Sequence, residues 1–398
     1  MSDDPISGGE DWSDFSIDAR RAPDARRPRQ YEPSVEYQAG EMSQVSISLT
    51  EVPEDEAKWR EEIQRVTGLT VPDHRKVELA QVRYWGNPQE PNVYCRFLIA
   101  DREDASPAVD AVEILNSLDR SGARKIYTGP ATFCVSWNDW QVAKMEGGGT
   151  AGLAARLDSA FDACVDRARE LRRIGRDLGS LVILGGGDMI EGCQIFANQS
   201  YEIDSDRRAQ IRNAVTFILS GLDRLAPLFS DVRVLVVGGN HGENRIGGKR
   251  TTRHDNDDCA VFEHAALAAS RDSRLKHVKF FIAQDEPAKT LDVNGWILAT
   301  THGHVFGRGG GHVAQKAHKW YSGQAAGRFP AGDADLLVTH HYHHQASQDW
   351  GACKWVQTPA MDGGSPHFTD GTGFAAGPGM LTWVMSDDSR WSDAQVVS

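Results

Sequence analysis

Residues 181–191 read LVILGGGDMIE, an apolar run that ends in three glycines and an aspartate, Asp188. The apolar run predicts a buried strand, and a glycine-rich turn after such a strand brings the next polar side chain to the carboxyl edge of a sheet. Open α/β sheets bind their ligands at that edge. The stretch therefore predicts an α/β fold in which Asp188 faces a ligand site.

The same construction recurs at three later stretches. Residues 232–237 run into GGNHGEN, residues 296–299 into TTHGH, and residues 336–338 into THHYHH. An earlier apolar stretch, ATFCVSW at 131–137, is followed by Asn, Asp, Trp and Gln. Each of these turns carries side chains of the kinds that bind metal ions.

The segments between the first of these strands carry apolar residues at helical spacing. This spacing predicts helices over 151–178, over 206–225, where Pro227 stops the helix, and over 257–270. Alternation of strands and helices predicts a parallel sheet with right-handed crossovers.

The sequence after residue 270 predicts a series of short strands, namely HVKFFIA, AKTLDV, GWILATTHG, DLLVTHHYHH, CKWVQTP and GMLTWVM. These predict a second, largely antiparallel sheet packed beside the first. The predicted fold of residues 128–398 is therefore α/β, a two-sheet βαβ sandwich.

The first 127 residues have a different character. Residues 1–50 mix acidic and Arg-rich sequence without helix or strand periodicity, which predicts a disordered arm. Residues 51–127 predict a small α+β module in the order helix, strand, strand, helix. The first helix is expected to end near Gly68, and the second is expected to begin after Pro107. An interaction or substrate-guiding role and a plain packing extension both remain open for this module.

Composition limits the classes of protein that fit. The sequence has no apolar run long enough to cross a bilayer, and its acidic N-terminus does not resemble a signal peptide. Six cysteines occur singly, which predicts neither a zinc knuckle nor a disulfide framework. We expect a cytoplasmic protein of a prokaryote or a phage-infected cell. The net charge of −13 argues against coating nucleic acid by bulk attraction, so any basic surface has to be local.

The candidate metal ligands offer oxygen or imidazole nitrogen, and none of them is a cysteine. They are Asp139, Gln141, Asp188, Asn240, His302, His341 and His343. Taken singly, such residues also suit helix caps and tight turns, but here they follow successive strands. There are too many ligands for one ion, and a central aspartate able to bridge predicts a two-metal hydrolytic centre. We expect two divalent ions, Mn first, with Mg, Fe and Zn as alternatives.

In this order the residues resemble the motifs of the calcineurin-like metallophosphoesterase family. The family motifs read DxH, GDxxD or GDxxE, GNHD or GNHE, an isolated His, and GHxH. Their counterparts lie within about residues 128–385 and are Asp139-Trp140-Gln141, GDMIE at 187–191, GNH at 239–241, His302, and His341-Tyr342-His343. The chain departs from the family where Gln141 replaces His, where His340 replaces Gly, and where Gly242 delays the acidic Glu243 by one position.

The resemblance also implies a role for each residue. One metal would be held by Asp139, Gln141 and His343, the other by Asn240, His302 and His341, with Asp188 as the bridge. His241 would protonate the leaving oxygen or stabilise the phosphoryl transition state, and a metal-bound hydroxide would be the nucleophile. Glu191 is expected to brace the turn after Asp188.

Basic residues cluster after His241 and after His304. They are Arg245, Lys249, Arg250, Arg253, Arg308, Lys316 and Lys319, and they could line a groove for a polyanion or be solvated loop charges. Within the family, HHYHH and GPGMLTWVM resemble the nuclease branch, which includes double-strand-break repair nuclease subunits and phage-encoded exonucleases. The predicted function is a metal-dependent DNA exonuclease or endonuclease.

Two alternatives remain open. One is a small-substrate phosphatase or phosphodiesterase, and the other is a non-catalytic DNA-binding or scaffold protein on the same fold. DNA is the expected partner and a membrane is not, while a homodimer stays open.

Overall fold

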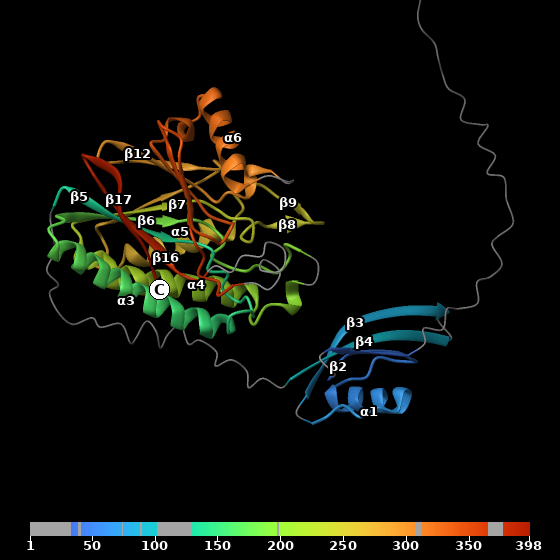
Figure 1. Cartoon of the computed structure of the whole chain (residues 1–398). Helices are drawn as coiled ribbons and strands as arrows, with labels where there is room; N and C mark the ends of the chain where they lie inside the picture. The colour runs from blue at the N-terminus through green and yellow to red at the C-terminus, as the bar shows by residue number, and fades with distance from the viewer. Residues whose placement is uncertain are drawn as a thin grey trace, which may run out of the picture. The chain divides into compact units, whose positions relative to one another are not determined.

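The computed structural model describes residues 33–38, 41–73, 75–87, 90–101, 129–196, 199–307, 312–364 and 377–398. The chain divides into two compact units, Met1–Ala105 and Ser106–Ser398 (Figure 1). Among the described residues, no helix combines the length and apolar character needed to cross a bilayer.

The Met1–Ala105 unit contains an antiparallel sheet with one helix packed on it. The strand order is β1 (Ser34–Gln38), β2 (Glu41–Leu49), β4 (Glu90–Asp101) and β3 (Arg75–Asn87). Helix α1 (Glu56–Thr67) begins at the N-cap Asp55 and ends at Gly68, which has a φ of 72°. Alternate strand residues such as Ile47 and Phe97 are buried in one cluster with Ile63 of α1.

The disordered arm predicted over residues 1–50 is wrong for residues 34–38 and 41–49, which form β1 and β2. Strand β2 pairs with β4, and its alternating Val45, Ile47 and Leu49 belong to the buried cluster. The helix and the two strands predicted for the small module are present as α1, β3 and β4. Residues 1–32, the helix predicted after Pro107 and the boundary predicted between residues 127 and 128 lie outside the described residues.

The first sheet of the Ser106–Ser398 unit has six strands. Their order is β10 (Val278–Ile282), β7 (Asp231–Val236), β6 (Leu178–Gly185), β5 (Ala131–Trp137), β16 (Met380–Ser386) and β17 (Ser389–Val397). The first four are parallel, and β16 and β17 run antiparallel to their neighbours.

Three helices cover one face of this sheet, as Figure 1 shows: α3 (Gly149–Arg173), α4 (Arg207–Leu225) and α5 (Asp257–Ala269). Phe133 and Ile183 point from the strands into the cluster that these helices share. The intervening residues, such as Cys134 and Val182, belong to a different cluster on the other face. This alternation follows from the two-residue period of side chains along a strand.

The second sheet is mixed. Its order is β11 (Lys289–Val293), β12 (Trp296–Thr301), β13 (Leu336–Thr339), β15 (Lys354–Gln357) and β14 (Ala346–Asp349). Strands β12, β13 and β15 are parallel, whereas β11 and β14 are antiparallel to their neighbours. One face shares a buried cluster with the first sheet, and the other packs against helix α6 (Val313–Ala326).

Short elements complete the unit. They are η2 (Gln199–Tyr201), η3 (Ala226–Leu228), the hairpin strands β8 (Arg245–Ile246) and β9 (Lys249–Arg250), η4 (His304–Phe306) and η5 (Pro330–Asp333).

Three sequence predictions need correction here. HVKFFIA and GMLTWVM form β10 and β16 of the first sheet rather than strands of the second. Two of the four strand pairings in the second sheet are parallel, so that sheet is not largely antiparallel. Residues 313–326 form helix α6 rather than a basic loop, with Ala314 and Ala317 buried and the partly buried Val313, Trp320 and Tyr321 packed against the same cluster.

Leu298→Ala should lower the free energy of unfolding by about 2–5 kcal/mol, because the side chain is fully buried in the cluster that both sheets share. Chemical denaturation followed by circular dichroism measures this change. Leu267→Ala is the matched control, since Leu267 is 67% exposed and its truncation should cost less than about 0.5 kcal/mol. Equal effects of the two substitutions would contradict the shared core.

Candidate metal centre

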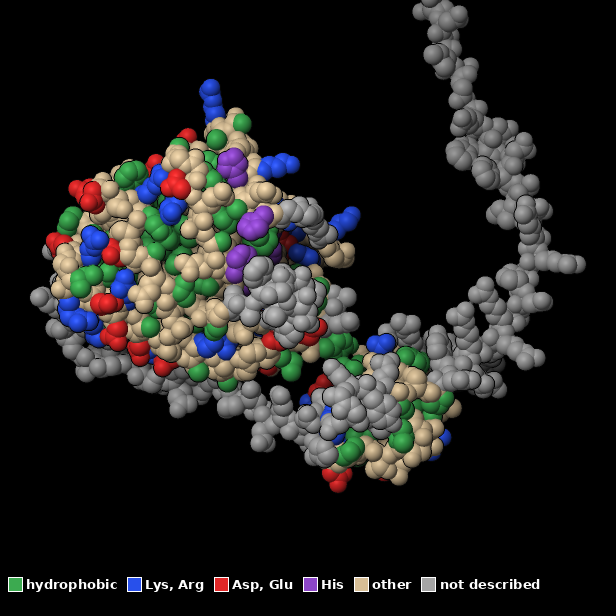
Figure 2. Space-filling view, in the orientation of Figure 1, with side chains coloured by type: hydrophobic (Ala, Val, Ile, Leu, Met, Phe, Trp, Pro, Cys, Tyr) green, Lys and Arg blue, Asp and Glu red, His purple; other side chains and the backbone are tan. Residues whose placement is uncertain are grey.

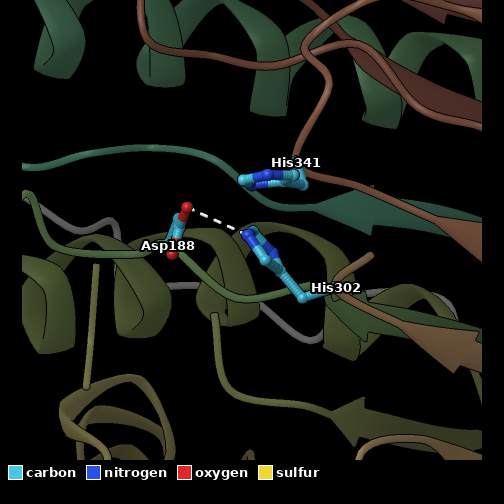
Figure 3. A group of neighbouring side chains, drawn as sticks. All are labelled: Asp188, His302 and His341. Atoms are coloured by element: carbon cyan, nitrogen blue, oxygen red, sulfur yellow. Dashed lines mark ion pairs between the residues drawn. The ribbon is translucent and has the colours of Figure 1, made fainter. Parts of the chain in front are cut away.

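Loops that leave both sheets bring the predicted ligands together. Asp139, Asp188 and Asn240 follow strands β5, β6 and β7 of the first sheet, and His302 and His341 follow β12 and β13 of the second. One ligand atom each from Asp188, His302 and His341 lies within 4.8 Å of the others. Figure 3 shows these three side chains pointing toward one another.

The backbone of the candidate ligands is unusual. Five of the nine non-glycine residues with positive φ in the described chain are predicted ligands: Asp139, Gln141, Asp188, His341 and His343. Residues with side chains rarely adopt this conformation, and it concentrates at functional sites. The surrounding structure thus holds these five side chains in conformations that the local sequence alone does not favour.

Asp188 lies at the centre of the cluster and is 1% exposed. Its Oδ1 accepts a hydrogen bond of 2.7 Å from the backbone N–H of His241. Its Oδ2 lies 2.9 Å from His302 Nε2. Because His302 Nδ1 lies 2.8 Å from the Gly186 carbonyl and donates to it, a neutral ring turns its Nε2 lone pair toward Oδ2. Two electron-pair donors, the imidazole nitrogen and the carboxylate oxygen, then face each other, and this arrangement suits a bound cation.

The pKa values of His302 and Asp188 reflect the attraction between the imidazole and the carboxylate. Burial lowers the pKa of His302, but the negative charge of Asp188 outweighs it and brings the pKa to about 9. Burial raises the pKa of Asp188, but the positive charges of His302 and His241 have the larger effect and hold this pKa well below its usual range. The buried carboxylate is therefore balanced by a proton on His302, or by a metal ion in its place.

Asn240 and His341 complete this side of the cluster. Asn240 Oδ1 lies 3.2 Å from His302 Nε2, and the ring centroids of His302 and His341 are 5.0 Å apart. Burial and the charge of His302 lower the pKa of His341 to about 4. The His341 ring is thus neutral at physiological pH, the form that binds a metal ion.

Asp139 and His343 form the other side. His343 Nε2 lies 3.1 Å from Asp139 Oδ1, and its Nδ1 lies 3.2 Å from Asp362 Oδ2. Burial lowers the pKa of His343, but the two carboxylates raise it to about 10. An imidazole held by a carboxylate on its far nitrogen is a common support for a metal ligand.

Gln141 lies beside this pair but its amide oxygen is already engaged. Gln141 Oε1 accepts a hydrogen bond of 3.1 Å from Lys144 Nζ, and Gln141 Nε2 lies 3.3 Å from His241 Nε2. Lys144 also pairs with Asp362 at 2.5 Å. Lysine thus supplies positive charge on the side where the family motif has a histidine.

His241 is held by Glu191. Its Nδ1 lies 2.8 Å from the Glu191 carbonyl and 3.3 Å from Glu191 Oε2. Burial lowers the pKa of His241, but Asp188 and Glu191 raise it to about 9. Glu191 therefore does more than brace its turn, and it contacts the imidazole that the sequence assigns to proton transfer.

Gly242 explains why the acidic residue comes one position late. A Cβ atom at this position would lie 2.6 Å from Asn256 Oδ1 and 2.6 Å from Asp258 Oδ2. A side chain does not fit there. Glu243 instead pairs with Arg245 and Arg250, so it does not orient His241.

His340 is a structural residue. It is fully buried, with Nε2 lying 2.9 Å from Thr300 Oγ1 and Nδ1 lying 2.7 Å from Thr358 Oγ1. Burial lowers its pKa to about 3, so the ring is neutral. Its ring packs on Gly186, where a Cβ atom would lie 2.4 Å from His340 Cδ2.

Asp258 was not predicted, although it organises the site. Its Oδ2 accepts hydrogen bonds of 2.8 Å from the backbone N–H groups of Asp188 and Gly239, and its Oδ1 accepts one of 2.8 Å from Met189. Burial and the charge of Asp188 raise its pKa to about 6. No sequence signal marks Asp258, because an acidic residue in the first turn of a helix is an ordinary feature.

The predicted basic residues lie beside the site with different partners. Arg245 and Arg250 pair with Glu243, and Arg253 Nη1 donates to the Asp285 carbonyl at 2.8 Å. Lys249 is exposed on β9. Arg308 lies outside the described residues, and Lys316 and Lys319 belong to helix α6.

A small pocket is lined by Arg250, Arg253 and His304 together with the backbone of Gly239. Figure 2 shows histidine side chains gathered on one side of the Ser106–Ser398 unit, with basic side chains beside them.

Solved structures of phosphoesterases are among those to which the chain is similar. A predicted phosphoesterase from Streptococcus pneumoniae has 11% identity over 67% of this chain and 98% of its own, with a TM-score of 0.26. A novel archaeal phosphodiesterase has 8% identity over 67% and 99%, with a TM-score of 0.31. Vps29 from Entamoeba histolytica, in complex with zinc, has 12% identity over 67% and 98%, with a TM-score of 0.28.

The sequence matches no protein-family model and no curated protein. TM-scores this low assign neither a family nor a function to the chain. The functional assignment therefore depends on the site and its motifs.

Asp258→Asn should destabilise the protein by roughly 3 kcal/mol or more, because the amide nitrogen cannot accept the buried backbone hydrogen bonds that the carboxylate accepts now. Chemical denaturation measures the loss. Asp166→Asn is the control, since Asp166 is an exposed residue of α3 paired with Arg169 and should change stability by less than about 0.5 kcal/mol. A fully stable Asp258→Asn protein would contradict the role assigned to this carboxylate.

Saturating Mn²⁺ should raise the unfolding temperature of the wild-type protein, and a chelator should reverse the rise, because an ion bound only by the folded state stabilises it. At a concentration about 100 times the dissociation constant, the gain is about 2.7 kcal/mol. Asp188→Asn should lose most of this shift, and Asp349→Asn, an exposed control, should retain it. A shift in Asp188→Asn equal to that of the wild type would rule out this site as the origin.

Proposed function

We propose that the chain is a two-metal phosphodiester hydrolase of the calcineurin-like metallophosphoesterase family, with DNA as its substrate. The observation that carries this proposal is the convergence of Asp188, His302 and His341, which come from two sheets and follow the order of the family motifs. The buried cluster shared by both sheets supports the two-sheet fold of that family.

The residues fit two divalent ions, with Mn²⁺ the first choice. Asp188 would be shared by both, and each ion would have ligands from a different side of the cluster: Asp139, Gln141 and His343 on one side, and Asn240, His302 and His341 on the other. When bound, such ions lower the pKa of a water molecule and neutralise charge on the phosphoryl oxygens. The departure at Gln141, whose oxygen accepts from Lys144, makes that side the weaker of the two.

His241 is the residue that would handle the proton of the leaving group. Glu191 holds Nδ1, so Nε2 faces the cluster beside Gln141. Without bound ions, burial lowers the pKa of His241 but Asp188 and Glu191 raise it to about 9, and the contact with Glu191 favours the protonated ring that can donate a proton to a leaving oxygen. Glu191 keeps the ring oriented and favours its charged form.

DNA is favoured as the substrate by the basic residues beside the site. Arg250 and Arg253 line the pocket next to Gly239, and Lys249 is exposed on the same hairpin as Arg250. Phosphate contacts from such side chains position a nucleic-acid backbone. One observation favours a second candidate, a small-substrate phosphatase or phosphodiesterase: Glu243 already pairs with Arg245 and Arg250, which reduces the charge offered to a polyanion.

His241→Ala should reduce kcat for cleavage of end-labelled DNA in Mn²⁺ by about 100-fold or more, because the leaving oxygen loses its proton donor. Cleavage is measured on single- and double-stranded DNA with Mn²⁺, Mg²⁺ or chelator. His318→Ala is the matched control, since His318 is exposed on α6 and packs on Trp350.

Two results would contradict the proposal. If the wild type cuts neither DNA but hydrolyses small phosphodiesters, the second candidate is correct. If His241→Ala cuts DNA as fast as the wild type, the role given to His241 is wrong.

A further inference from the structure

Four exposed apolar side chains lie on chain segments near the candidate centre. Met145 is 45% exposed, Phe196 44%, Tyr201 48% and Ile246 78%. These are four of the seven large hydrophobic residues that are exposed in the described part of the chain. We refer to the four as the apolar rim. Single exposed hydrophobic residues are ordinary, but a group of them marks a binding surface.

Hydrogen bonds and a ring contact connect the rim to His241. The Phe196 ring centroid lies 6.4 Å from that of His241, with the rings nearly perpendicular at 73°. Arg245, the neighbour of Ile246, donates from Nη1 to the Ile195 carbonyl at 3.0 Å. On the other side, Met145 N donates to the Glu202 carbonyl at 3.1 Å, next to Tyr201. The segments of Ile246 and Met145 are therefore hydrogen-bonded to residues that neighbour Phe196 and Tyr201, and Phe196 itself contacts the imidazole.

The hairpin that carries Ile246 has a tight turn and two ion pairs at its base. Its two turn residues, Gly247 and Gly248, have φ values of 58° and 78°, as a tight two-residue hairpin requires. At its base, Glu243 pairs with Arg245 of β8 and Arg250 of β9. The exposed Ile246 and Lys249 pair with each other in this hairpin, which is labelled β8 and β9 in Figure 1.

We propose that the apolar rim binds unpaired nucleotide bases on the leaving-group side of the scissile phosphate. This inference rests on the proposed nuclease function, in which His241 faces the leaving oxygen. Aromatic side chains stack on any base, and apolar side chains such as isoleucine insert between bases. Because the exposed Lys249 pairs with Ile246 across this hairpin, the surface suits a ligand that is both aromatic and anionic. A purely apolar protein partner would not need this cation.

Phe196→Ala tests the proposal in the full chain with two single-stranded oligonucleotides of equal length, one normal and one lacking all its bases. We expect kcat/KM on the normal oligonucleotide to fall by roughly 5- to 100-fold, the range given by loss of one base–aromatic stack. Activity on the abasic oligonucleotide should fall less, because that substrate reports only the loss of the Phe196 contact with the His241 ring. Phe196→Tyr should restore cleavage, and Phe329→Ala, which removes another exposed phenylalanine (55% exposed), should have no effect.

Binding without metal separates this proposal from the proposed function. The affinity of the wild type and of Phe196→Ala for the normal oligonucleotide is measured by fluorescence anisotropy in chelator. Weaker binding by Phe196→Ala supports the rim even if the wild type cuts no DNA, in which case only the nuclease function fails. Equal losses on both oligonucleotides, or no loss in cleavage and binding, would overturn the proposal and leave a protein partner as the occupant of the rim.

Discussion

The carboxylate of Asp258 connects the two glycine-rich loops on which the candidate centre depends. It accepts backbone hydrogen bonds from Asp188 and Met189 in one loop and from Gly239 in the other. The loops approach so closely that a Cβ atom on Gly239 would lie 2.1 Å from Asp188 Oδ1. Asp258 is in the first turn of α5, where the helix dipole favours a negative charge. One buried side chain thus sets the distance between the central aspartate and the loop of Asn240 and His241.

Charge balance explains the behaviour of the buried histidines. His302 and His343 lie against carboxylates, and their pKa values are about 9 and 10. His340 and His341 make no ion pair among the described residues, and burial lowers their pKa values to about 3 and 4. The same residue type therefore serves as a charged partner, a neutral ligand or a packing group. The neighbours decide which, because imidazole titrates close to physiological pH.

The strands that end in glycine and a ligand were predictable, since buried strands and glycine turns are local features of sequence. The assignment of strands to sheets was less so. HVKFFIA belongs to the first sheet because α5 returns the chain to the side of β7. The apolar residues of this strand do not themselves indicate that β7 is its neighbour. Helix α6 was missed although Val313, Ala317 and Trp320 follow helical spacing, because the basic, glycine-rich sequence before it is typical of a loop. The contacts of Asp258 with Asp188 and Gly239, and of Glu191 with His241, were not predicted from the sequence. These contacts join residues that are distant in the chain.

The sequence alone determined which side chains are available and in which order they follow the strands: carboxylate, amide and imidazole, without cysteine. The tertiary structure decided what each of them touches. It placed Glu191 rather than Glu243 against His241, enclosed His340 between two threonines, and turned the Gln141 oxygen to Lys144. It also gathered the apolar rim from three segments. The physical reason is that loop conformations with positive φ, and hydrogen bonds between distant loops, exist only when both sheets are packed.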